Sequence, residues 1–208
     1  LFINPEGQFI FNVGGNGTTS IVVSDPKQEG VWYDVTIVLN QELDLISLYI
    51  DGILEGEASI ADIGTIGNNY GLYMGGNVLY NTAYFSGSID DVSIWSTSLS
   101  QSEIDDLFCN TLIGSETNLV TFWNFEEGAG DFIYGTSIET ETNGIINGAT
   151  YSEDVLQSCL PLTASQSGIQ GFVSSSFQTI PLNENPYTDW HMISTYMNSN
   201  EDIESIMS

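Results

Sequence analysis

The fold of this chain is limited most narrowly by residues 85–108, which read FSGSIDDVSIWSTSLSQSEIDDLF. The first half alternates apolar and polar residues with the period of a β-strand. The apolar side changes between Ile89 and Val92, which suggests a bulge at Asp90 and Asp91. Ser100 and Glu103 then form a capping box ahead of apolar residues at helical spacing. The stretch therefore predicts a strand over residues 85–95 and a short helix over residues 101–108.

The residues before this stretch alternate in the same way and contain many turn signals. GGNG at residues 14–17 and Asp51-Gly52 both read as hairpin turns. So many short strands with almost no helix argue for an all-β antiparallel sandwich. The expected strands lie at residues 9–13, 21–23, 31–39, 46–50, 53–55 and 71–76.

At these residues the chain resembles the laminin G-like domains of the concanavalin A-like lectin/glucanase superfamily, bacterial type. Residues 87–104 resemble the family's closing strand, G-x-I-D-D-V-x-I-W, and the L-S-x-x-E-I that follows it. The resemblance extends back through WYDVTIVLN and LYIDGILEGE. It implies a concanavalin A-like jelly roll with one short helix, whose N-terminal strands would precede the start of this chain. It is specific for the fold and not for a ligand, because one fold hosts many functions.

Four segments are expected along the chain. Residues 1–109 form the jelly roll. Residues 110–159 include LVTFWNFEEGAG, which also resembles the family and either packs on the first unit or begins a second copy. Packing is favoured because sheets avoid open edges. Residues 160–176 read as a linker, and residues 177–208 loosely resemble a small β-rich module that is cut short here.

The charge balance excludes several classes of partner. The chain has 28 acidic residues against a single Lys+Arg, which is Lys27, and its formal net charge is −27. Metal cations, salt or a cationic partner must screen this charge. Nucleic acids and anionic membranes are repelled, and no apolar run is long enough for membrane insertion. We expect a secreted or cell-surface segment of a longer chain, with neighbouring domains.

Cys109 and Cys159 leave two alternatives open. Each lies at the edge of an expected unit, and a disulfide between them fits an exported protein. The alternative is two unpaired thiols. Neither cysteine has a basic neighbour that would lower its pKa, and no Cys/His cluster suggests zinc.

Catalytic patterns are missing from the sequence, so we expect no enzyme. Glucanases of the superfamily place two carboxylates on one strand as E-x-D-x-E, which no expected strand here contains. Glu103, Asp105 and Asp106 have part of that spacing but lie on the expected helix, as a solvated face. His191 is more simply a packed or edge residue than a catalytic base. A glycoside hydrolase is therefore the least favoured function.

Asp90 and Asp91 are the candidate ligands for Ca²⁺, because a bend in an acidic strand gathers the oxygens that calcium prefers. The resemblance implies that Asp91 reaches the metal beside a D-x-S-G-N-G-N loop. The chain departs from that loop and has Gly135 in place of the aspartate. Alternatively, one aspartate is solvated and the other binds backbone N–H groups.

Aromatic residues around the glycine-rich loops are candidates for stacking on sugar rings, with an amide to bind hydroxyl groups. The alternative is that these aromatic residues belong to the core. The candidate ligand-binding residues are Tyr70, Tyr73, Asn77, Tyr80 and Tyr84. We therefore expect a non-catalytic extracellular binding or adhesion module, whose partner is a carbohydrate or a surface protein. Ca²⁺ is the candidate cofactor for this binding. The alternative is a structural spacer in a multidomain surface protein.

Overall fold

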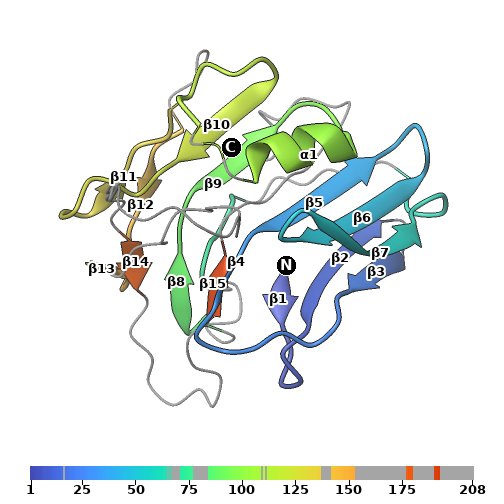
Figure 1. Cartoon of the computed structure of the whole chain (residues 1–208), viewed down its shortest axis with the longest axis horizontal. Coiled ribbons are helices and arrows are strands. Elements are labelled where there is room, and N and C mark those ends of the chain that lie inside the picture. The colour runs from blue at the N-terminus through green and yellow to red at the C-terminus, as the bar shows by residue number, and fades with distance from the viewer. Residues whose placement is uncertain are drawn as a thin grey trace, which may run out of the picture.

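The computed structural model describes residues 1–15, 17–64, 66, 71–76, 84–108, 110, 112–136 and 142–152, and the backbone alone of residues 177–179 and 190–192. These residues form short strands and one helix, α1 (Gln101–Leu107), which confirms the all-β sandwich with a short helix (Figure 1). The strands are β1 (Phe2–Ile3), β2 (Phe9–Gly15), β3 (Thr18–Val23), β4 (Trp32–Tyr33), β5 (Val35–Asn40), β6 (Leu45–Ile50), β7 (Ile53–Ser59), β8 (Gly87–Ile89), β9 (Val92–Trp95), β10 (Leu119–Trp123), β11 (Phe132–Ile133), β12 (Gly144–Ile145), β13 (Thr150–Ser152), β14 (Phe177–Thr179) and β15 (Trp190–Met192).

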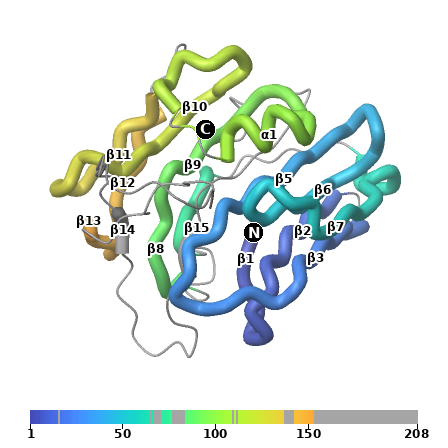
Figure 2. The backbone as a smooth tube through the Cα atoms, in the orientation of Figure 1, coloured from blue at the N-terminus to red at the C-terminus, as the bar shows by residue number. Residues whose placement is uncertain are grey.

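Two three-stranded antiparallel sheets enclose the main core. The order is β1-β2-β3 in one sheet and β5-β6-β7 in the other, and Figure 2 shows β3 running beside β7. The approach is close because β7 has a glycine there: a Cβ on Gly56 would lie 3.0 Å from the Val22 side chain. Alternate residues of β2 and β6, such as Phe9 and Leu48, point into this core and are fully buried. The period of two in the sequence therefore predicted the core face correctly.

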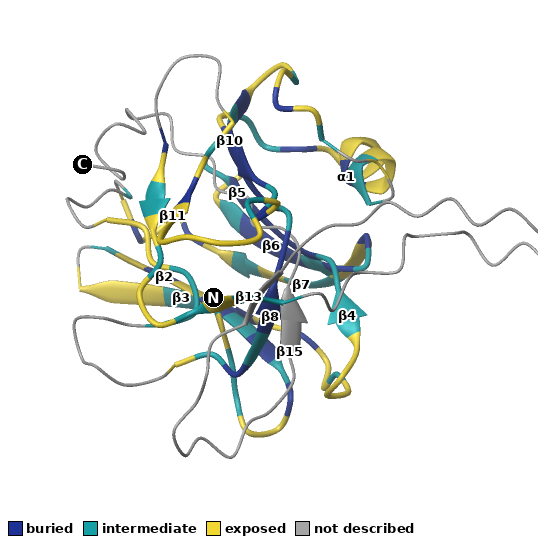
Figure 3. Ribbon diagram, turned by 90° about the vertical axis from the view of Figure 1, so that its left-hand side faces the viewer, coloured by how far each residue is buried: buried dark blue, intermediate teal, exposed yellow. Residues whose placement is uncertain are grey.

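Strand β5 is buried on both of its faces. Ile37 and Leu39 face the main core, and Val38 packs on the other side with Trp95 and Ile104. Ile104 is the buried residue of α1, whose outer side stays exposed (Figure 3). The helix begins at the expected capping box, with the Ser100 and Glu103 side chains each accepting a hydrogen bond from the other residue's backbone. The cap thus fixes the helix that covers one side of β5.

The expected single strand over residues 85–95 is wrong. The chain forms β8 and β9 in two different sheets, with Asp90 and Asp91 between them. Asp91 has a φ of 50°, a left-handed conformation that turns the chain from one sheet into the other. The strand expected at residues 71–76 is also absent, since no strand is formed there and Gly75 has a φ of 76°.

Later segments add to the sheets. Strand β10 pairs antiparallel with β9, and residues of a third core, among them Trp123 and Phe125, pack on Ile89 and Val92. A five-stranded sheet has the order β13-β14-β8-β15-β4, in which β15 is parallel to both of its neighbours. The division into segments at residues 109, 159 and 176 stays a prediction.

Cys109 and Cys159, the expected disulfide, lie outside the described residues. Within the described part of the chain, no helix combines the length and apolar character that crossing a membrane requires.

Candidate functional site

The break between β8 and β9 places its two aspartates in different environments. Asp90 is fully buried, whereas Asp91 is partly exposed. Burial, together with the negative charge of Glu126, raises the pKa of Asp91 to about 6. Asp91 is therefore a partly shielded carboxyl close to a second acid, which suits a group that takes up a proton or a cation.

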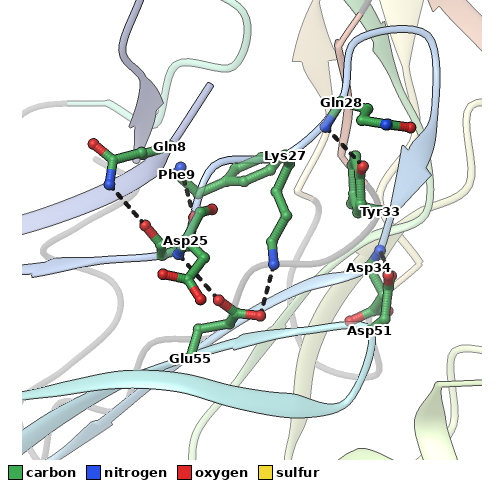
Figure 4. Close-up of polar contacts among 10 residues, drawn as sticks. Gln8, Phe9, Asp25, Lys27, Gln28, Tyr33, Asp34, Asp51 and Glu55 are labelled. Carbon is green, nitrogen blue, oxygen red and sulfur yellow. Dashed lines mark hydrogen bonds and ion pairs between the residues drawn. The ribbon is translucent and has the colours of Figure 1, made fainter. Parts of the chain in front are cut away.

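A further acidic pair closes the end of the β5–β6 ladder. The Asp34 N–H donates to Asp51 Oδ1 at 2.9 Å, and the Asp51 N–H donates to the Asp34 carbonyl at 2.9 Å (Figure 4). The pKa of Asp34 is raised to about 6, because burial and the charges of Asp51 and Asp91 outweigh the opposing effect of the hydrogen bond from Thr36. Asp34 therefore lies near both Asp51 and Asp91, although the three residues come from three segments of the chain. We name these three residues the acidic cluster.

Sequence analysis singled out only Asp91 from the acidic cluster. One signal could have found the other two members. Val35 pairs with Ile50, so the residues just outside that pair, Asp34 and Asp51, must lie opposite each other. The approach of Asp91 to this pair depends on the packing of β8 and β9 and has no local signature.

The single basic side chain is already used within the fold. Lys27 Nζ lies 2.7 Å from Glu55 Oε1, and the Asp25 N–H donates to the same carboxylate at 3.0 Å (Figure 4). Burial alone would raise the pKa of Glu55, but these two partners hold it below its ordinary value. Lys27 and Glu55 therefore neutralise each other within the fold.

The calcium site expected at Asp90 and Asp91 stays a prediction. Calcium takes six to eight oxygen ligands, and no group of three acidic, His or Cys side chains among these residues is placed to hold a metal ion. Gly135, which replaces the expected aspartate, packs against the Thr142 and Thr121 side chains, so even a Cβ has no room there. An aspartate side chain at this position would therefore not fit the packing seen here.

Two of the five candidate ligand-binding residues lie on described loops. The Tyr73 and Tyr84 side chains are 53% and 40% exposed. A Cβ on Gly76 would lie 2.9 Å from the Tyr84 ring, so the ring rests against the glycine backbone. The Phe85 N–H donates to the Gly75 carbonyl at 2.9 Å and so joins the segment that holds Tyr84 to the segment that holds Tyr73. Tyr70, Asn77 and Tyr80 lie outside the described residues.

Two of the three carboxylates of α1, those of Glu103 and Asp105, have structural partners. Glu103 caps the helix, and Gln101 Nε2 donates to Asp105 Oδ1 at 2.8 Å and to the Gly52 carbonyl at 2.7 Å. These contacts hold the helix and its link to the β6–β7 turn. For His191, only the backbone of β15 is described.

Comparison with known proteins gives one finding for this chain. A laminin G family model, described as the concanavalin A-like lectin/glucanases superfamily, matches residues 1–105 of the 208 residues. No curated protein and no solved structure matches the chain.

Proposed function

This chain belongs to the laminin G-like family of the concanavalin A-like lectin/glucanase superfamily, and from that premise we propose that it is a non-catalytic extracellular binding module for a neutral carbohydrate. Family membership supports a binding module but leaves the ligand open. The structural partners of Glu103 and Asp105 support the non-catalytic part of the proposal, because both side chains serve the helix.

The observation that carries the sugar ligand is the exposure of Tyr73 and Tyr84 on joined, glycine-rich loops. Aromatic rings stack on the apolar faces of sugars, and a ring held against backbone loses little freedom when it binds. Tyr84 meets this condition through its contact with Gly76. The pair therefore supports a preformed stacking platform.

The charge of the chain supports a neutral sugar rather than an acidic one. A net charge of −27 repels sulfated and carboxylated glycans at low salt. The one Lys or Arg side chain, Lys27, is already paired with Glu55. It therefore does not offset the repulsion of an acidic glycan. Hydroxyl groups, in contrast, donate readily to carboxylates and carbonyls.

Binding to an array of neutral and acidic oligosaccharides tests the proposal. We expect neutral glycans to bind, and Tyr73→Ala to weaken the best of them by about tenfold, as loss of a central aromatic contact does. Phe2→Ala is the matched control, since the Phe2 side chain is about as exposed and lies on β1 rather than on these loops. If no glycan binds, or if both variants weaken binding equally, the sugar platform is wrong and the structural spacer becomes the better interpretation.

Calcium dependence of this binding is a separate proposal that rests on Asp91. The test compares glycan binding in 1 mM calcium with binding in excess chelator, and repeats it for Asp91→Asn. Calcium-dependent binding that Asp91→Asn abolishes would support the proposal. Unchanged binding in chelator would contradict it, in line with the incomplete set of ligands among the described residues.

A further inference from the structure

The hairpin of β11 and β12 exposes apolar side chains on its outer side. Phe132, Tyr134 and Ile145 are 51%, 56% and 77% exposed. Phe132 and Tyr134 are two positions apart and lie on either side of the buried Ile133, so they point away from the core together. We name these three side chains the hairpin face.

The hairpin face is contiguous. Phe132 pairs directly with Ile145. The Ile146 N–H donates to the Asp131 carbonyl at 2.9 Å, which makes residues 131 and 146 a hydrogen-bonded pair. The next pair, Phe132 and Ile145, is then a non-hydrogen-bonded pair, in which side chains lie closest. The aromatic ring and the branched aliphatic chain therefore form one apolar surface.

The hairpin that carries this face is held in place from behind. One carboxylate, that of Glu127, accepts hydrogen bonds from the Tyr134 N–H at 2.7 Å and from the Tyr151 hydroxyl at 3.0 Å. Ile133 packs into the core with Trp123 and Phe125. A braced surface loses little freedom on binding, so its exposed apolar groups are suited to contact another molecule.

The charge around the hairpin face indicates the chemistry of its partner. Asp131, directly before Phe132, is an exposed acid, and the chain as a whole carries a formal net charge of −27. Aromatic ring faces attract arginine and lysine side chains, and neighbouring carboxylates add to that attraction. A sugar fits less well, because Ile145, the most exposed of the three side chains, has no ring to stack.

We propose that the hairpin face docks a cationic polypeptide segment in which arginine or lysine alternates with apolar side chains. The apolar side chains cover Phe132 and Ile145, and the cations lie on Tyr134 and beside Asp131. This site goes beyond the proposed sugar platform and uses none of its residues.

The test uses the whole chain and a fluorescein-labelled decapeptide of alternating arginine and leucine. An otherwise identical peptide of alternating glutamate and leucine is the charge control. Fluorescence anisotropy in 150 mM NaCl should show binding of the arginine peptide alone. Phe132→Ser/Ile145→Ser should weaken that binding by about tenfold, as loss of a central anchor does. The matched control is Leu43→Ser/Ile53→Ser, which removes two exposed aliphatic side chains from the turn before β6 and from the start of β7.

A photo-crosslinking version of the arginine peptide then maps the contact, which we expect at residues 131–134 or 144–146. Circular dichroism of each variant shows whether it is folded, and Asp131→Asn, which leaves the apolar pair intact, should also weaken binding. Equal binding by both double variants would overturn the proposal, since it would show that charge alone attracts the peptide. Crosslinks elsewhere, or a glycan that needs Phe132 and Ile145, would overturn it as well.

Discussion

At the residue scale, the carboxyl of Asp34 connects the acidity of this chain to its stability. The Thr36 hydroxyl donates to Asp34 Oδ1 at 3.1 Å, and the backbone N–H of Asp34 is taken by Asp51. Burial, with the charges of Asp51 and Asp91, raises the pKa of Asp34 to about 6 from an ordinary value of about 3.9. The folded state therefore holds this proton more tightly than the unfolded chain does. Its stabilising contribution is complete below about pH 4 and is lost as the pH rises through 6.

We predict that Asp34→Asn stabilises the protein by about 1–3 kcal/mol at pH 7.5 and changes little at pH 4. The amide keeps an oxygen that accepts from Thr36 and removes the charge that burial disfavours. Urea unfolding of both proteins at the two pH values measures the difference.

Removing any acid from so acidic a chain relieves general repulsion, so a control is needed. Asp62→Asn removes an exposed acid and should change the free energy of unfolding much less. If both substitutions stabilise the protein equally at pH 7.5, burial of Asp34 is not the cause.

At the element scale, the approach of β10 to the turn after β11 depends on one glycine. The Thr121 and Thr142 hydroxyls hydrogen-bond to each other, and Trp123 Nε1 donates to the Thr142 carbonyl at 2.7 Å. Gly135 lies against both threonines. These contacts connect the braced hairpin to the β9–β10 pair, so they position both the hairpin face and the neighbourhood of Asp91.

We predict that Gly135→Ala lowers the free energy of unfolding by about 1–3 kcal/mol, because the added methyl group overlaps the threonine side chains. Gly14→Ala is the matched control, since a Cβ there meets its nearest atoms at 3.5 Å. Thermal unfolding of both variants checks the difference. A loss of stability in Gly14→Ala as large as that in Gly135→Ala would show that glycine replacement in general, and not this contact, is responsible.

At the scale of the whole molecule, the net charge of −27 opposes folding. Three local features of the described fold reduce the repulsion between acids. They are the ion pair between Lys27 and Glu55, the raised pKa values of Asp34 and Asp91, and the use of Glu103 as a helix cap. Most of the repulsion is left to dissolved cations. The same excess of negative charge would attract the cationic partner proposed for the hairpin face.

We predict that the melting temperature rises by about 2–6 °C when NaCl is increased from 10 to 150 mM at pH 7.5, because the screening length falls from about 30 to about 8 Å. Differential scanning calorimetry measures the shift, and sucrose at equal osmolality serves as the control. An unchanged melting temperature in NaCl, or an equal rise in sucrose, would show that charge repulsion does not limit stability.

Local sequence patterns predicted the local structure well. Alternation located β2, β3, β5 and β6 to within a few residues, and the Ser100–Glu103 box located the start of α1. The same alternation failed at residues 71–76, where the positive φ of Gly75 prevents a strand, and across Asp91. Of the candidate site residues, Asp91, Tyr73 and Tyr84 are partly or largely exposed. The sequence did not predict the hairpin face, because alternation does not reveal which side of a short pair of strands is buried.

The sequence by itself determined the strand period, the hairpin turns, the helix cap and the charge, because each depends on residues a few positions apart. Tertiary structure alone decided that Asp91 comes near Asp34, that Asp91 turns the chain between two sheets, and that Gly135 leaves no room for a carboxylate. These outcomes depend on which sheets pack together. Packing brings distant residues to within a few ångströms, and no local pattern in the chain encodes those distances.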